Sequence, residues 1–230
     1  MKPIVPHLLP MQCKYCNQPC IKKGLYNGVQ KMYCKACHKY QRSIYTYRLT
    51  NATDDTNIVL LTKESMSISS IARYLKMAKT TVGRRILKIS QRIPYPILSE
   101  TNQIYEVDEM QTYIGRRQIS CHVYVTYAIN RITKAVADFI IGSRTKETIG
   151  KLIDRLLFLT PKKIYTDGLN IYPSLIPFSI HRCFRYKTNV IERNNLSIRN
   201  SLKRLSRKTI CFSKNTLMLE ACLKIYFWSD

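Results

Sequence analysis

Apolar and polar residues alternate in short runs from about residue 104, and after these runs the apolar residues recur at helical spacing. Alternation over residues 104–110, 118–130 and 135–142 predicts three strands. The short breaks between them are typical of an antiparallel meander. Leucine and isoleucine then recur every three or four residues over 146–159, which predicts a helix that Pro161 ends.

Two shorter strands and a second long helix are predicted beyond this point. Residues 163–166 and 181–186 are the strand candidates, and residues 191–205 carry apolar side chains at helical spacing. Three strands, a helix, two short strands and a helix form the order of a ribonuclease-H-like core. We therefore expect a mixed sheet with helices over residues 99–230.

Residues 50–98 show helical spacing in adjacent segments. Residues 56–63 are compatible with a helix, Ser67 precedes apolar residues at helical steps, and Thr80 opens a further helix after a short break. This last helix has an apolar face and a polar or basic face, formed by Thr81, Arg84, Arg85 and Lys88. Such a pair is typical of a helix-turn-helix that enters the major groove of DNA. The alternative is an ordinary helical hairpin with a solvated basic face.

Residues 1–49 carry two cysteine pairs with the spacing of zinc ligands. The pairs are Cys13-x-x-Cys16 and Cys34-x-x-Cys37, with 17 residues between them. Zinc prefers four soft ligands in a tetrahedron, and each two-residue gap lets one turn supply two thiolates. Asn27-Gly28 between the pairs is a strong hairpin signal. We predict a zinc ribbon with a structural Zn²⁺; redox or buried cysteines are the alternative.

Two nearby residues complicate the ligand set of this predicted ribbon. Cys20 and His38 lie close in sequence to the two pairs, and either could replace one ligand. The four symmetric cysteines are nevertheless sufficient for a tetrahedral site.

The charge balance indicates a polyanionic partner. The chain has 230 residues, 38 Lys plus Arg and 14 Asp plus Glu, for a net charge of +24. Residues 1–50 contain nine basic residues and no acidic one. Nucleic acid is the expected partner, and an anionic membrane surface is a distant second. The absence of an apolar run of 18 or more residues argues against a membrane span.

Cysteine number and the N-terminal residues favour a reducing compartment. Nine cysteines cannot form a fully paired secreted framework. The first twelve residues contain three prolines and lack the apolar run of a signal peptide. We expect a cytoplasmic, multidomain α+β or α/β protein in three parts: residues 1–49, 50–98 and 99–230.

Three acidic residues stand out because acids are scarce. Asp108 lies within a predicted strand, where Asp is disfavoured, and alternation puts Glu106 on its face and Glu109 on the other. Asp167 follows a strand, and Glu192 is the only acid among ten Lys and Arg over residues 181–214. A common Asp-Gly turn and a helix-start anion are the structural alternatives for Asp167 and Glu192.

Three sequence motifs resemble those of the insertion-sequence-one family of transposases. They are Tyr105-Glu106-Val107-Asp108-Glu109, then Tyr165-Thr166-Asp167-Gly168 with Tyr172, then the run from Ile191-Glu192-Arg193-Asn194-Asn195 to Arg199. The stretches Arg204–Thr209 and Phe212–Lys214 extend the match. The family also carries an N-terminal zinc finger and a helix-turn-helix, so the resemblance covers essentially the whole chain.

The resemblance implies a D-D-E transposase with a defined site. Its acidic triad would be Asp108, Asp167 and Glu192, which would hold two Mg²⁺ ions, or Mn²⁺. The substrates would be double-stranded DNA at the element's ends, which carry terminal inverted repeats, and target DNA. The protein would act as a homo-oligomer on DNA, associated with the nucleoid.

A basic stripe near the C-terminus would contact DNA phosphates. A solvated helix face is the alternative for these residues: Arg193, Arg199, Lys203, Arg204, Arg207 and Lys208.

Two other functions remain open from sequence. The chain could be a DNA-binding regulator whose third part is catalytically dead, or a nuclease or resolvase of the same fold that cuts without joining.

Overall fold

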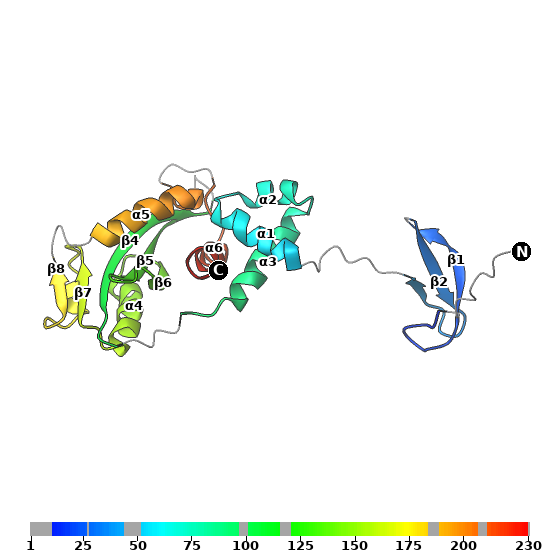
Figure 1. Ribbon diagram of the computed structural model, residues 1–230, viewed down its shortest axis with the longest axis horizontal. Coiled ribbons are helices and arrows are strands. Elements are labelled where there is room, and N and C mark those ends of the chain that lie inside the picture. Colours follow the sequence, from blue (N-terminus) through cyan, green and yellow to red (C-terminus); the bar gives the residue numbers. More distant parts are fainter. Residues whose placement is uncertain are drawn as a thin grey trace, which may run out of the picture. The chain divides into compact units, whose positions relative to one another are not determined.

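The structure, a computed structural model, describes residues 11–26, 28–43, 52–96, 101–115, 121–183, 189–206 and 211–229. The chain forms two compact units, Met1–Asn51 and Ala52–Asp230. Figure 1 shows the helices and strands of both.

The first unit is a small antiparallel sheet with almost no apolar core. It contains β1 (Cys20–Tyr26), β2 (Val29–Cys34) and β3 (Tyr40–Arg42) in the order β1-β2-β3. Tyr26 pairs with Val29, so a two-residue turn joins β1 to β2, and Gly28 has a φ of 75° there. The predicted hairpin is confirmed, although Asn27 itself lies outside the described residues.

Three helices follow at the start of the second unit. They are α1 (Ala52–Lys63), α2 (Ile68–Tyr74) and α3 (Lys79–Arg92). Ser67 caps α2, because its hydroxyl accepts a hydrogen bond from the Ser70 N–H at 3.1 Å. Residues 75–78 form the turn between α2 and α3, and Lys76 adopts a φ of 52° within it.

A five-stranded mixed sheet forms the rest of the second unit. Its strands are β4 (Ile104–Ile114), β5 (Cys121–Asn130), β6 (Val136–Gly142), β7 (Lys163–Thr166) and β8 (His181–Cys183). The order is β6-β5-β4-β7-β8. The first three strands form the predicted antiparallel meander, and the last two run parallel to β4.

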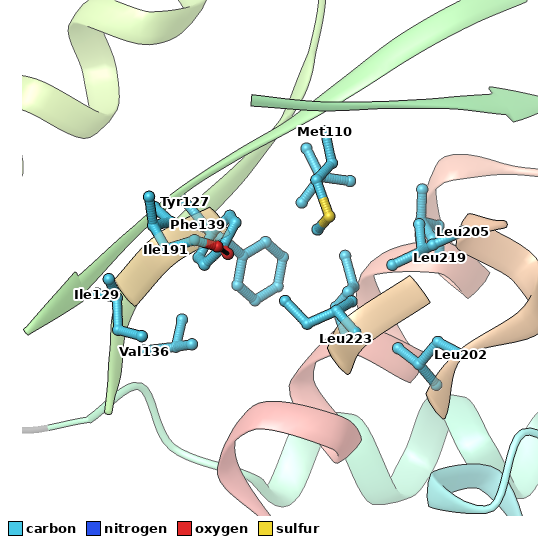
Figure 2. Close-up of a cluster of buried hydrophobic side chains, with 12 residues drawn as sticks. Met110, Tyr127, Ile129, Val136, Phe139, Ile191, Leu202, Leu205, Leu219 and Leu223 are labelled. Carbon is cyan, nitrogen blue, oxygen red and sulfur yellow. Dashed lines mark hydrogen bonds between the residues drawn. The ribbon is translucent and has the colours of Figure 1, made fainter. Parts of the chain in front are cut away.

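Helices cover both faces of this sheet. Helix α4 (Lys146–Phe158) packs with the buried face that includes Tyr105 and Val107 of β4. Helices α5 (Asn189–Ser201) and α6 (Thr216–Trp228) pack on the opposite face. Figure 2 shows Met110 and Tyr127 of the sheet in one cluster with leucines of α6 and of the segment that follows α5.

Helix α6 was not predicted, and it joins the helices to the sheet. Leu219 and Leu223 contribute to the core under the sheet, whereas Ala221, Cys222 and Ile225 contribute to the core formed with α1, α2 and α3. In Figure 1, α6 lies between the two groups. Residues 52–229 therefore share one compact unit, in place of the separate 50–98 and 99–230 parts expected. None of the described helices is long and apolar enough to cross a membrane.

Candidate functional site

Two parallel strands bring Asp108 and Asp167 together where β7 ends beside the central strand β4. Strands β4 and β7 pair in parallel from Ile104 opposite Lys163 to Val107 opposite Thr166. Asp108 and Asp167 are the residues that follow the last pair on the two strands. Strand β7 ends there while β4 continues to Ile114, so Asp167 lies beside the middle of β4, and two residues 59 positions apart in sequence become neighbours.

Glu109 joins these two acids. Carboxylate oxygens of Asp108, Glu109 and Asp167 all lie within 4.8 Å of one another. The predicted alternation holds: Asp108 contacts α5, while Glu109 contacts Tyr172, which belongs to the core on the α4 side of the sheet. Such oxygen donors suit hard cations such as Mg²⁺ or Mn²⁺, which relieve the repulsion between converging carboxylates.

Burial disfavours the ionised forms of Asp108 and Glu109. Burial raises the pKa of Asp108, the Glu109 N–H and Asn195 side chain oppose that rise, and the charges of Asp167 and Glu192 add to it. Burial likewise raises the pKa of Glu109. Converging carboxylates with raised pKa values are a frequent mark of functional sites.

The third predicted acid, Glu192, lies beside the cluster and not within it. Its side chain is exposed near the start of α5 and is absent from the group of three close carboxylates. Asn195 lies one helical turn further on and donates a hydrogen bond from Nδ2 to Asp108 Oδ2 at 2.6 Å. Glu192 therefore faces the part of the sheet that carries Asp108, and its charge acts on that carboxyl.

Asn195 and Tyr127 fix the position of Asp108. The Tyr127 hydroxyl, which is fully buried, donates to Asn195 Oδ1 at 2.9 Å, and this orients the amide that donates to Asp108. Helical spacing puts Asn195 on the same side of its helix as the buried Ile191 and Ile198, but no sequence pattern indicates that its amide reaches Asp108.

Glu106 shares a strand face with Asp108 but has a structural role. Its Oε2 accepts the Ile191 N–H at 3.0 Å, near the start of α5, and its Oε1 lies 3.1 Å from Arg131 Nε. A carboxylate at this place satisfies a helix-start N–H and the positive end of the helix dipole.

His181 also has a structural environment. Its Nε2 lies 2.8 Å from the Thr166 hydroxyl, and burial followed by the charge of Arg182 lowers its pKa.

Replacing Asp108 by Asn is expected to stabilise the protein at neutral pH in the absence of divalent cations. Because its folded-state pKa lies above its ordinary value, the folded protein holds an extra proton there, and the free energy of unfolding falls as pH rises above about 4. The variant should lack this loss, so its Tm should exceed that of the wild type by a few degrees at about pH 7 and converge with it at about pH 4.

Thermal unfolding of zinc-loaded protein across this pH range measures the effect. Asp154→Asn is the matched control, because Asp154 is exposed on α4. A Tm difference for Asp108→Asn that does not grow with pH contradicts this account.

The four predicted zinc ligands meet in the first unit. The sulfurs of Cys13, Cys16, Cys34 and Cys37 all lie within 4.8 Å of one another, with Cys13 to Cys37 at 3.5 Å and Cys16 to Cys34 at 3.4 Å. Ligands at a tetrahedral zinc are about 3.8 Å apart for Zn–S bonds near 2.3 Å. Burial opposes ionisation of Cys13, but N–H groups of Tyr15 and Cys16 lower its pKa to about 6. The arrangement fits a structural Zn²⁺.

The two alternative ligands lie outside this group. Cys20 is buried and accepts a hydrogen bond from Gln41 Nε2, with Sγ at 3.6 Å, and burial raises its pKa to about 11. His38 Nδ1 lies 2.8 Å from the Tyr33 hydroxyl.

The predicted DNA-contacting residues of α3 divide into two kinds. Arg84 and Lys88 are exposed, and Thr81 is half-buried beside them. The side chain of Arg85 is 11% exposed and lies 3.2 Å from Asp54 and 3.5 Å from Asp55. Arg85 therefore links α3 to α1, and this contact explains the acidic pair at the start of α1.

The predicted basic stripe is only partly described. Arg193 and Lys203 are exposed, whereas Arg199 and Arg204 are half-buried, and Arg204 donates to Ser213 Oγ at 2.9 Å. Arg207 and Lys208 lie outside the described residues. Lys203, Arg204 and Lys214 line a pocket of about 470 Å³ whose other wall includes Ser65 and Ser67, beside α2.

Comparisons with known proteins identify the family. The IS1 transposase family model matches residues 103–228. The insertion element IS1 2 protein InsB of Escherichia coli (strain K12) is 36% identical over 110 residues, 48% of this chain and 65% of the relative. The iso-IS1n protein InsB of Shigella dysenteriae is 35% identical over 112 residues, 49% of this chain and 84% of the relative. This chain thus spans just under two thirds of the E. coli relative.

A solved structure gives a much weaker likeness. A chain in the cryoEM structure of the simian T-cell lymphotropic virus intasome in complex with the PP2A regulatory subunit B56 gamma is 17% identical. The likeness covers 73% of this chain and 65% of that chain, with a TM-score of 0.36. This value is too low to bear on the fold. The family model, which matches more than half of the chain, carries the assignment: the protein belongs to the IS1 transposase family.

Proposed function

We propose that this protein is a DNA transposase that binds the ends of its insertion sequence, cleaves a strand there and joins it to target DNA. The observation that carries the proposal is the meeting of Asp108, within β4, and Asp167, just past the end of β7, in the region matched by the family. The sheet order β6-β5-β4-β7-β8, with two antiparallel and two parallel strand pairings, supports a ribonuclease-H-like fold.

The site supports phosphodiester chemistry that depends on divalent cations. Asp108 and Asp167 would hold Mg²⁺ or Mn²⁺ from the sheet, with Glu192 approaching from α5. Bound cations of this kind make an oxygen nucleophile more reactive and stabilise the oxygen that leaves. Asn195 and Tyr127 would keep Asp108 in its orientation.

The reaction would proceed in two displacements at phosphorus. Water would first replace the 3′ oxygen of the phosphodiester at the element's end, which frees a 3′-hydroxyl. That hydroxyl would then attack a target phosphodiester, forming one P–O bond as another breaks. Neither step needs a covalent bond between protein and DNA.

DNA recognition would come from α3 and the zinc ribbon. The exposed polar face of α3 carries Arg84 and Lys88, and α2 and its turn precede α3 as in a helix-turn-helix. The basic first unit, with four thiolates suited to zinc, would add contacts to the DNA backbone. Several chains would be needed to hold two ends, so we propose a homo-oligomer on DNA.

Replacing Arg84 and Lys88 together by Gln is expected to weaken binding to the terminal inverted repeat. For each phosphate contact that the variant loses, the slope of the logarithm of the DNA-binding constant against the logarithm of salt concentration should become shallower by about 1. Gel-shift titrations over several salt concentrations measure this slope. Lys151→Gln, an exposed cation on α4, is the control and should bind as the wild type does. An unchanged slope in the double variant contradicts a DNA-facing α3.

A strand-transfer assay tests the proposed function directly. It combines wild-type protein, Mg²⁺, target plasmid and a labelled duplex that carries the inverted repeats flanking the coding region. Joined product is expected. Cleavage without joined product would indicate a nuclease or resolvase, and end binding without either product would indicate a regulator.

A further inference from the structure

We propose that Arg144 is a DNA-phosphate ligand of the active site, held there by Glu109 and Tyr172, and that Glu109 positions this arginine and is not a metal ligand. The inference rests on the proposed function, since it assigns a substrate contact at the same site.

Both carboxylate oxygens of Glu109 are already engaged. Arg144 Nε donates to Oε2 at 3.0 Å, and Arg144 Nη2 lies 3.0 Å from the same oxygen. The Tyr172 hydroxyl donates to Oε1. The Glu109 side chain is 1% exposed, and Tyr172 is fully buried. Oε2 thus accepts two contacts from Arg144 and Oε1 accepts one from Tyr172, so a metal ion would have to compete for a buried carboxylate that is already paired with an arginine.

Arg144 extends from this anchor towards the acidic pair. It lies between the end of β6 and the start of α4, two well-ordered elements that fix its backbone. Its Nη2 is 3.7 Å from Asp167 Oδ2, which is longer than its contact with Glu109. The weaker contact can give way when a cation binds Asp167, while the stronger one holds the guanidinium in place.

The Arg144 guanidinium is accessible to a ligand. Its side chain is 39% exposed, its Cζ lies 5.7 Å from the centroid of the Tyr124 ring, and its contacts with carboxylates among the described residues use Nε and Nη2. Arginine presents paired donors that match the oxygens of a phosphate. A guanidinium at the rim of Asp108 and Asp167 is thus suited to hold a non-bridging oxygen of a DNA phosphate at the reacting position.

Metal binding without DNA separates this proposal from its main rival, in which Glu109 coordinates the metal. Mn²⁺ is titrated calorimetrically into full-length, zinc-loaded wild type, Glu109→Gln, Arg144→Gln and Asp167→Asn. Asp167→Asn should weaken Mn²⁺ binding by about 10-fold or more, since a ligand is lost. Glu109→Gln should stay within about 3-fold of the wild type, and Arg144→Gln should bind equally well or more tightly because a competing positive charge is gone. A loss in Glu109→Gln as large as in Asp167→Asn overturns the assignment.

DNA binding and cleavage test the role of Arg144. Arg144→Gln should bind end DNA more weakly in Ca²⁺ and should cleave it about 10- to 100-fold more slowly in Mg²⁺, the range expected for a lost charged hydrogen bond. Arg144→Lys should recover part of both losses. Lys151→Gln, which removes an exposed cation from α4, should lose neither. The proposal is overturned if the Arg144→Gln variant binds and cleaves end DNA as well as the Lys151→Gln variant does.

Tyr172→Phe and the double variant separate positioning from folding. Tyr172→Phe keeps the buried ring and should lower cleavage with Mn²⁺ binding intact. Glu109→Gln combined with Arg144→Gln should cleave no more slowly than Arg144→Gln alone, because Glu109 acts through Arg144. If wild-type protein neither cleaves nor joins, the proposed function fails, yet the Mn²⁺ titrations and the Ca²⁺ binding comparison still decide the roles of Glu109 and Arg144.

Discussion

The Asp167→Asn variant is expected to lose strand cleavage and strand transfer by about 1,000-fold or more, which corresponds to about 4 kcal/mol of transition-state stabilisation. Asp167 follows β7 directly, and its carboxylate is one of three within 4.8 Å. Asparagine has a neutral amide where aspartate has a carboxylate, so the variant loses a negatively charged ligand for the divalent cation. Binding to end DNA should persist or tighten, because a negative charge close to the phosphates is removed.

Glu192→Gln and Asp154→Asn complete this experiment. Glu192→Gln should show a comparable loss if the exposed carboxylate on α5 closes around the same cations. Asp154→Asn removes an exposed acid on α4 and should react as the wild type does. Rates are measured on labelled end DNA at saturating Mg²⁺, alongside gel-shift binding. Normal joining by Asp167→Asn, with folding intact, would rule out the D-D-E assignment.

The sequence predicted the elements that carry the acids because each has a clear local period. The alternating pattern of β4 predicted that Asp108 and Glu109 point to opposite faces of the sheet. A short strand was predicted over residues 163–166, and β7 does end at Thr166, directly before Asp167. Local patterns thus placed Asp108 within a strand and Asp167 at the end of another. The parallel pairing of β4 with β7, which brings the two acids together, is a contact between distant segments that no local pattern encodes.

Helix α6 was missed because its sequence lacks an amphipathic period. Leu219, Ala221, Cys222, Leu223 and Ile225 are all buried, and they lie on more than one face of the helix. A helix that packs against the sheet on one side and α1 and α3 on another has no consistently polar face. Its aromatic end, residues 226–228, packs against the cluster under the sheet.

The contacts of the arginines could not be predicted from sequence. Arg85 and Arg84 are adjacent basic residues, yet one pairs with Asp54 and Asp55 and the other is exposed. Arg144 reaches Glu109 from 35 residues away. Such pairs depend on how helices and strands pack and on which rotamers remain open, and no short-range spacing encodes them.

Removing zinc is expected to unfold the first unit and leave the second unit intact. Among the described residues of the first unit, the buried apolar cluster contains Cys13, Cys20, Met32 and Cys34, and three of these four are cysteines. So small a core cannot offset the conformational entropy of the chain, whereas zinc binding contributes about 10–16 kcal/mol in comparable small domains. Chelation should therefore abolish the β1–β2–β3 sheet.

Substitutions distinguish the ligands from their neighbour. Cys34→Ser should lower the zinc content below one ion per chain and remove amide protection in residues 20–42. Cys20→Ser is the matched control, since Cys20 is buried in the same cluster but lies outside the four-sulfur group, and it should retain one zinc. Zinc content by mass spectrometry and hydrogen exchange of both units provide the readouts. A first unit that stays protected in chelator would show that the hairpin folds without metal, and zinc lost from Cys20→Ser as from Cys34→Ser would place Cys20 among the ligands.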